Sequence, residues 1–148
     1  MHFATIIPAE EEYVKYRFWK ESFKMIRKDE LASAAATGNT ELVGILLQNG
    51  ADVNAVNSFG QTPLQVMMMG NTAVAQLLLE CGANPNRRDS HVGATPLHDA
   101  AREGFLDTVA ILIQYHADIN AEDYHGRKPV DLAETNGHQD VVAFLESA

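Results

Sequence analysis

A histidine followed directly by an aspartate, His98 and Asp99, is the pair in this sequence that could carry acid–base chemistry. A general base must reach a proton of its substrate, and a neighbouring carboxylate can orient an imidazole for that task. The stretch TPLHDAAREG, residues 95–104, predicts a helix, and neighbours at i and i+1 on a helix point apart. No nucleophile or oxyanion donor is evident beside the pair. We therefore expect no catalytic residues and a protein that is not an enzyme, with His98 bonded to backbone.

The sequence offers few residues that could bind a metal or a cofactor. The six histidines show no pair at ligand spacing on one predicted helix, and Cys81 is the single cysteine. An internal disulfide or a thiolate metal cluster needs more than one cysteine. A glycine-rich phosphate loop is lacking as well. We expect no metal, no cofactor and a half-buried, unreactive thiol at Cys81.

A charged trio on the same predicted helix has the spacing of a binding surface. Asp99, Arg102 and Glu103 stand at i, i+3 and i+4 and share one side of the helix. The other side holds Leu97 and two alanines. Charges at such positions confer specificity and register on a protein interface. A solvated helix face is the alternative interpretation.

Charge is distributed unevenly along the 148 residues. Residues 1–28 carry six Lys/Arg against four Glu, a net charge of +2, and residues 29–148 carry five against sixteen Asp/Glu, a net charge of −11. An acidic body disfavours nucleic acid and anionic membrane and favours a partner with a basic face. No apolar run is long enough to span a bilayer, and low cysteine content is typical of reducing compartments. We expect a protein of a reducing compartment that binds another protein, with no nucleic acid and no membrane.

The elements that must position these residues form a repeat. Glycines at 38, 70, 104 and 137 are spaced by 32, 34 and 33 residues, which is the length of an ankyrin unit. We therefore predict an all-α ankyrin-repeat solenoid of four helix-turn-helix repeats with hairpin fingers, preceded by an N-terminal helix. The repeats are residues 29–56, 57–88, 89–122 and 123–148, and residues 1–28 are an amphipathic helical extension.

Two repeats depart from the common register. Repeat two reads TPLQVMMMG where repeat three reads TPLHDAAREG, so Gly70 comes one residue early. Because a two-turn helix is already marginal, its shortened version predicts at most one irregular turn, with methionines filling the gap. The departure marks either a functional site or neutral drift. The finger of repeat three, DSHVG, has one residue extra.

The motifs QVMMMG (65–70), HDAAREGFLDT (98–108) and PVDLAETNGHQDVV (129–142) resemble the ankyrin-type inhibitors of cyclin-dependent kinases 4 and 6, especially their four-repeat A and B types. The resemblance covers residues 29–148. It implies a non-enzymatic inhibitor that binds the kinase beside its ATP cleft, distorts the ATP site and weakens cyclin D binding. Its consequence is negative regulation of the G1/S transition. A general ankyrin adaptor for another protein, such as a transcription factor, is the alternative.

The resemblance also assigns partner-binding residues. It places Asp99 against a basic kinase residue, with Arg102 and Glu103 beside it. Asp89 and Glu41 match acidic contacts of the family. The remaining members are the turn of repeat two and the finger before it: Gln65, Val66, Met67, Met68, Asn57 and Phe59.

Residues 1–28 have no counterpart in that resemblance. Tyr16, Trp19, Phe23 and Ile26 recur at i, i+3, i+7 and i+10, which predicts an amphipathic helix. Three interpretations stay open. The helix covers the flank of repeat one, it binds a partner or adds a kinase contact, or it is an alternative start of the chain.

Overall fold

The structure is a computed structural model that describes the backbone of residues 10–148 and the side chains of residues 12–18 and 29–148. Between residues 10 and 148 the chain is helical, with no strand. The helices in chain order are α1 (Glu10–Ala36), α2 (Thr40–Gln48), α3 (Pro63–Val66), α4 (Thr72–Glu80), α5 (Pro96–Glu103), α6 (Leu106–Gln114), α7 (Pro129–Thr135) and α8 (Gln139–Ser147).

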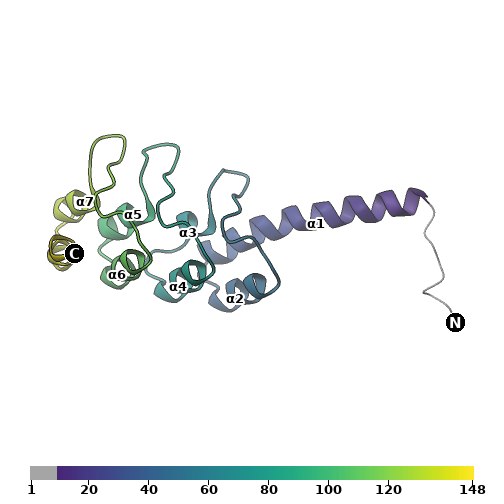
Figure 1. Ribbon diagram of the computed structural model, residues 1–148, viewed down its shortest axis with the longest axis horizontal. Coiled ribbons are helices and arrows are strands. Elements are labelled where there is room, and N and C mark those ends of the chain that lie inside the picture. Colours follow the sequence, from purple (N-terminus) through teal and green to yellow (C-terminus); the bar gives the residue numbers. More distant parts are fainter. Residues whose placement is uncertain (1–9) are drawn as a thin grey trace.

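The helices are stacked as antiparallel pairs, and the fingers rise from one side of the stack (Figure 1). The first helices α1, α3, α5 and α7 form one row, and the second helices α2, α4, α6 and α8 form the other. The fingers are residues 49–62, 81–95 and 115–128. This arrangement confirms the predicted all-α solenoid of helix pairs.

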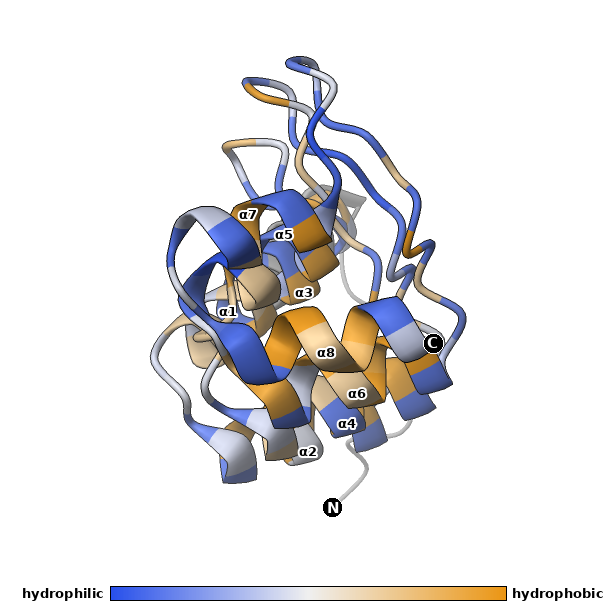
Figure 2. Cartoon of the chain, turned by 90° about the vertical axis from the view of Figure 1, so that its left-hand side faces the viewer, coloured by the Kyte–Doolittle hydropathy of each residue, from blue (hydrophilic) through white to orange (hydrophobic). Residues whose placement is uncertain are grey.

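The core lies between the two rows of helices. Leu97, Ala100 and Ala101 of α5 are completely buried, as the helical spacing predicts, and Leu78 and Leu112 fill the same layer from the second helices. Figure 2 shows hydrophobic segments along these helices and mainly hydrophilic fingers. Burial of this layer stabilises the array, since each repeat covers the apolar face of its neighbour.

Polar side chains connect successive repeats at the second helices and at the fingers. The Thr108 hydroxyl of α6 donates to the Met69 carbonyl of repeat two. In the fingers, the Asn54 side chain donates to the Gly82 carbonyl at 3.0 Å and accepts from the Asn84 N–H at 2.8 Å. These bonds fix the spacing of the fingers.

Helix α3 is a single turn, as predicted for the shortened repeat two. It begins with a capping box between Thr62 and Gln65 and ends at Val66, and the backbone of the next residue, Met67, is extended. Gly104 ends the full-length α5 in the left-handed backbone conformation, with a φ of 81°. Gly70 holds the corresponding position in repeat two, but its φ is not positive. The missing residue therefore removes the glycine stop signal along with part of the helix. Met67 and its neighbour Met69 are buried, so methionines do fill the gap.

Helix α1 passes from the extension into repeat one without a break at the predicted boundary between residues 28 and 29. Its C-terminal part packs on α2 and α3, and Figure 1 shows its N-terminal part leading away from the repeats. All side chains of residues 12–18 are exposed. This described part of the extension therefore does not cover the flank of repeat one.

We predict that α3 is the least protected helix of the array in hydrogen exchange. Three backbone bonds, donated by the amides of Gln65, Val66 and Met67, hold its turn, and such a helix opens without disturbing the rest. The measurement is native-state amide exchange by NMR, with α4 of the same repeat as the internal control. Equal protection of Val66 in α3 and Ala101 in α5 would contradict the prediction.

Candidate partner-binding surface

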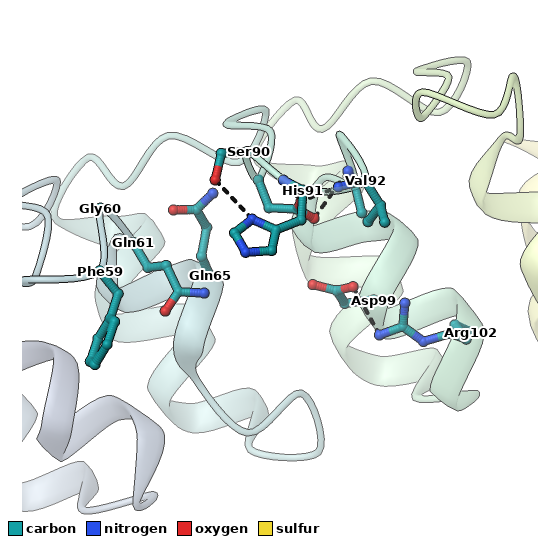
Figure 3. Close-up of a pocket in the computed structure, with 11 residues that line it drawn as sticks. Phe59, Gly60, Gln61, Gln65, Ser90, His91, Val92, Asp99 and Arg102 are labelled. Atoms are coloured by element: carbon teal, nitrogen blue, oxygen red, sulfur yellow. Dashed lines mark hydrogen bonds and ion pairs between the residues drawn. The ribbon is translucent and has the colours of Figure 1, made fainter.

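A hollow with a volume of about 480 Å³ opens between repeats two and three on the side of the first helices. Its walls come from both repeats (Figure 3). The lining residues are Phe59, Gly60 and Gln61 of one finger, Gln65 of α3, Asp89, Ser90, His91, Val92 and Ala94 of the next finger, and Asp99 and Arg102 of α5.

The first helices of repeats two and three are less closely packed at this hollow than those of the other repeats. Helix α5 packs closely on α7 and α6, but α3 packs on α1 and α4 and makes little contact with α5. Gln65 and Asp99, from different repeats, face the same hollow (Figure 3).

The charged pair on α5 forms the polar wall of the hollow. The Arg102 guanidinium donates to the Asp99 carboxylate at 2.9 Å, and the two side chains have exposed fractions of 43% and 26%. Burial raises the pKa of Asp99, and the nearby charges of Asp89 and Glu103 act in the same direction, while Arg102 opposes them. Asp99 is thus a poorly solvated carboxylate whose ionised form gains from a further cation.

Asp89 organises the finger that overhangs the hollow. Its carboxylate accepts the backbone N–H groups of His91, Val92, Gly93 and Ala94. Burial alone would raise the pKa of Asp89, but the backbone donors outweigh it and lower that pKa below its ordinary value. The predicted partner-binding residue Asp89 is therefore also the anchor of its own loop.

We predict a pH-dependent stability contribution from Asp89. Its pKa is lower in the folded chain than in the unfolded one, so its contribution is present above the unfolded pKa and is lost as the pH falls through the folded pKa. Asp89→Asn should lower the free energy of unfolding by about 1 kcal/mol at pH 7, since an amide replaces a charged acceptor. The difference should shrink below about pH 4.

The measurement is urea unfolding of both proteins at pH 7 and pH 3. Asp118→Asn is the matched control, because Asp118 is exposed and accepts one backbone bond in the next finger. A deficit of Asp89→Asn that is equal at both pH values would contradict the argument.

The structure brings together only some of the predicted site residues. Phe59, Gln65, Asp89, Asp99 and Arg102 line the hollow. Phe59, with an exposed fraction of 83%, also borders a smaller adjacent hollow of about 310 Å³ beside α1. That second hollow is lined by Asp29, Ala32, Ser33, Ala36, Asn57, Ser58, Phe59 and Val66.

The other predicted residues lie apart from the main hollow. Met67 is buried in the core, whereas Met68 has an exposed fraction of 56% and lies near Gly38. Glu41 is exposed in the first turn of α2, and Glu103 is exposed at the end of α5. Their roles in binding stay predictions.

Asn57 has a local structural role that the sequence reasoning missed. Its side-chain oxygen accepts the N–H groups of Phe59 at 2.9 Å and Gln61 at 3.1 Å, as Asp89 does in the following finger. The hollow also includes Ser90, His91 and Val92, which were not predicted. The extra residue in the DSHVG finger was the sequence feature that could have indicated them as part of the site.

Chemistry-bearing residues elsewhere agree in part with the predictions. His98 is buried, and its ring nitrogens bond to the Thr95 N–H at 3.1 Å and the Arg127 carbonyl at 2.8 Å, which confirms backbone bonding. The half-buried state predicted for Cys81 is wrong, since this thiol is exposed. Among the described residues no group of His, Cys, Asp or Glu is arranged to hold a metal ion. In the same part of the chain no helix is long and apolar enough to cross a membrane.

The stacked helix pairs and fingers define an ankyrin-repeat protein, and a family model for ankyrin repeats (3 copies) matches residues 31–123 and 67–147. Two relatives are more specific. Cyclin-dependent kinase 4 inhibitor B of Rattus norvegicus is 54% identical over 118 residues, which are 80% of this chain and 91% of the relative. Cyclin-dependent kinase inhibitor 2A of Homo sapiens is 53% identical over 120 residues, 81% of this chain and 77% of the relative. The chain belongs to the ankyrin-repeat family of these cyclin-dependent kinase inhibitors.

A more distant similarity falls outside that family. Tyrosine-protein kinase HTK16 of Hydra vulgaris is 34% identical over 116 residues, 77% of this chain and only 15% of the much longer relative. Repeats of this kind therefore also occur as a small part of a different class of protein.

Proposed function

We propose that this chain is a non-enzymatic inhibitor of cyclin-dependent kinases 4 and 6 and acts as a monomer in the cytoplasm and nucleus. Membership of the inhibitor family carries the proposal. The hollow beside α3 supports the proposal, because several of the predicted partner-binding residues line it. Its aromatic and charged lining is suited to a protein partner, because interfaces favour aromatic residues and arginine.

The charge distribution supports a kinase surface that presents a basic side chain to the hollow. Asp99 is partly desolvated and already paired with Arg102. A second cation would stabilise its ionised form, and such a contact would order the register of the two proteins. Phe59 and Met68 supply exposed apolar surface on the neighbouring elements.

The proposed mechanism is allosteric. The inhibitor binds beside the ATP cleft, opposite the cyclin, and prefers the arrangement of the kinase lobes in which the ATP site is misaligned. By linkage, a ligand that stabilises one lobe arrangement lowers the affinity of any ligand that needs the other. Weaker cyclin D binding and slower passage from G1 to S follow.

The alternative is a general ankyrin adaptor that binds another protein, such as a transcription factor. The specific observation in its favour is that similar repeats occur within a tyrosine-protein kinase of Hydra vulgaris. An adaptor would use the same hollow between repeats two and three without preferring a cyclin-dependent kinase.

Calorimetric titration of the full chain against purified cyclin-dependent kinases 4 and 6 tests the proposal, with cyclin-dependent kinase 2 as the distant control. The expected result is a 1:1 complex with the first two kinases and none with the third. Saturating cyclin D should weaken the complex, by the same factor by which the chain weakens cyclin D binding. Absence of binding at micromolar concentration would overturn the proposal and favour the adaptor.

A further inference from the structure

The described part of the α1 extension exposes an unusual amount of aromatic surface. Tyr13, Val14, Tyr16 and Phe18 have exposed fractions between 59% and 69%. They lie on the segment that projects away from the repeats (Figure 1). A folded protein rarely leaves large apolar side chains so closely spaced in water unless they contact another molecule.

The same helix carries a concentrated positive charge. Residues 15–28 hold six Lys/Arg and one acidic residue, a net charge of +5, whereas residues 29–148 have a net charge of −11. Because this segment is helical, Arg17, Lys20, Lys24 and Arg27 recur at i, i+3, i+7 and i+10 on one side of the helix. The aromatic and aliphatic positions 14, 18, 19, 23, 25 and 26 fall outside that stripe, whereas position 16 borders it and position 13 lies within it.

We propose that residues 12–28, which we call the basic extension, form a docking helix for a protein with an acidic, apolar-floored groove. The opposite charge of such a groove matches the basic stripe. Its floor would cover the apolar positions, which occupy a wider arc of the helix than the stripe does. A basic amphipathic helix inserted in an acidic groove is an established recognition mode. This interaction is separate from the proposed kinase contact, which lies on the repeats.

The continuity of α1 argues against a membrane as the occupant. A basic amphipathic helix can also lie flat on an anionic bilayer. Since α1 continues directly into repeat one, a flat helix would bring the acidic repeats toward the same negative surface. A groove encloses the projecting helix alone. Pairing of two basic extensions from two copies is disfavoured as well, because each carries a net charge of +4.

Trp19, the single tryptophan of the chain, makes the test direct. The probe is a tryptophan-free, calcium-loaded calmodulin, whose opened EF-hand domains present acidic, methionine-rich grooves. Adding it to the full chain should shift the Trp19 emission to shorter wavelength in a saturable 1:1 titration, and removing calcium with EGTA should reverse the shift. No shift with this probe would overturn the proposal.

Two variants with the same charge change test the basic stripe. Lys24→Glu should weaken binding by about tenfold, because it turns an attractive charge contact into a repulsive one. Arg87→Glu is the matched control, since Arg87 is exposed in a finger of the repeats, outside the basic extension. Equal weakening by both variants would show simple charge attraction and overturn docking through the basic extension.

Two further outcomes identify a different occupant. An emission shift with phosphatidylserine-containing vesicles and none with calmodulin would assign the basic extension to a membrane. A shift on raising the protein concentration alone, together with a dimer in sedimentation, would assign it to a second copy. Kinase binding by Lys24→Glu should equal that of the unchanged chain, so failure of this proposal is distinguishable from failure of the kinase proposal.

Discussion

Asp99→Ala should weaken binding to cyclin-dependent kinase 6 by about 1–3 kcal/mol, or roughly 5- to 150-fold. The carboxylate lies at the hollow with an exposed fraction of 26%, and burial holds its pKa above the ordinary value. Contact with a basic kinase residue would therefore stabilise the ionised Asp99 carboxylate, which is poorly solvated in the free protein. Calorimetric titration of both proteins measures the difference.

The thermal stability of the free protein shows whether a loss of kinase affinity comes from a lost contact or from unfolding of the variant. A carboxyl group whose folded pKa is raised contributes stability below its unfolded pKa and loses that contribution as the pH rises through the folded pKa. Asp99→Asn should accordingly keep or increase the thermal midpoint at pH 7 while it weakens kinase binding. Asp107→Ala is the matched control, because Asp107 is exposed at the start of α6 outside the hollow. Equal affinity losses for Asp99→Ala and Asp107→Ala would contradict a specific role for Asp99.

His98→Ala should lower the free energy of unfolding by about 2–4 kcal/mol. The imidazole is completely buried. It accepts the Thr95 N–H at the start of α5, and its other nitrogen donates to the Arg127 carbonyl at 2.8 Å in the finger of repeat four. Removing the ring leaves the buried Thr95 N–H without its acceptor and a cavity between repeats three and four, and the Arg127 carbonyl keeps only its bond from the Asp123 N–H.

Urea unfolding followed by circular dichroism measures that loss. His91→Ala is the control, since His91 is exposed at the rim of the hollow and bonds mainly to the neighbouring Ser90 hydroxyl. It should cost less than about 0.5 kcal/mol, as is usual for surface positions. A His98→Ala deficit no larger than that of His91→Ala would show that the buried bonds do not couple the repeats.

Much of the fold was predictable from sequence because a repeat states the same rule several times. The glycine spacing and the apolar positions of α5 were enough to place Leu97, Ala100 and Ala101 in the core. The one-turn α3 was predictable too, because repeat two has one residue fewer than repeat three between its capping threonine and its glycine, and a helix this short is already marginal.

The site was predictable only where charge and helix register act together, as at Asp99 and Arg102. The hydrogen bonds that Asn57 and Asp89 accept from their own loops were not predictable. Either side chain could bind a partner or the backbone of its own loop, and the loop conformation determines which of the two occurs. The exposure of Cys81 depends on how the fourth helix ends, which a sequence pattern places only within a residue or two. The continuity of α1 was hidden for a related reason, since no glycine or proline marks the junction near residue 28.

The slight contact between α3 and α5 also has a mechanical consequence. Along the row of first helices the array is interrupted once, between repeats two and three, while α4 and α6 remain packed together behind the gap. The two halves of the molecule are joined at the second helices and at the fingers, where the Asn86 side chain donates to the His116 carbonyl at 3.1 Å and accepts the Asp118 N–H at 2.7 Å. Bending about these joints changes the width of the hollow between repeats two and three. A surface built in this way can adjust its curvature to that of a protein partner.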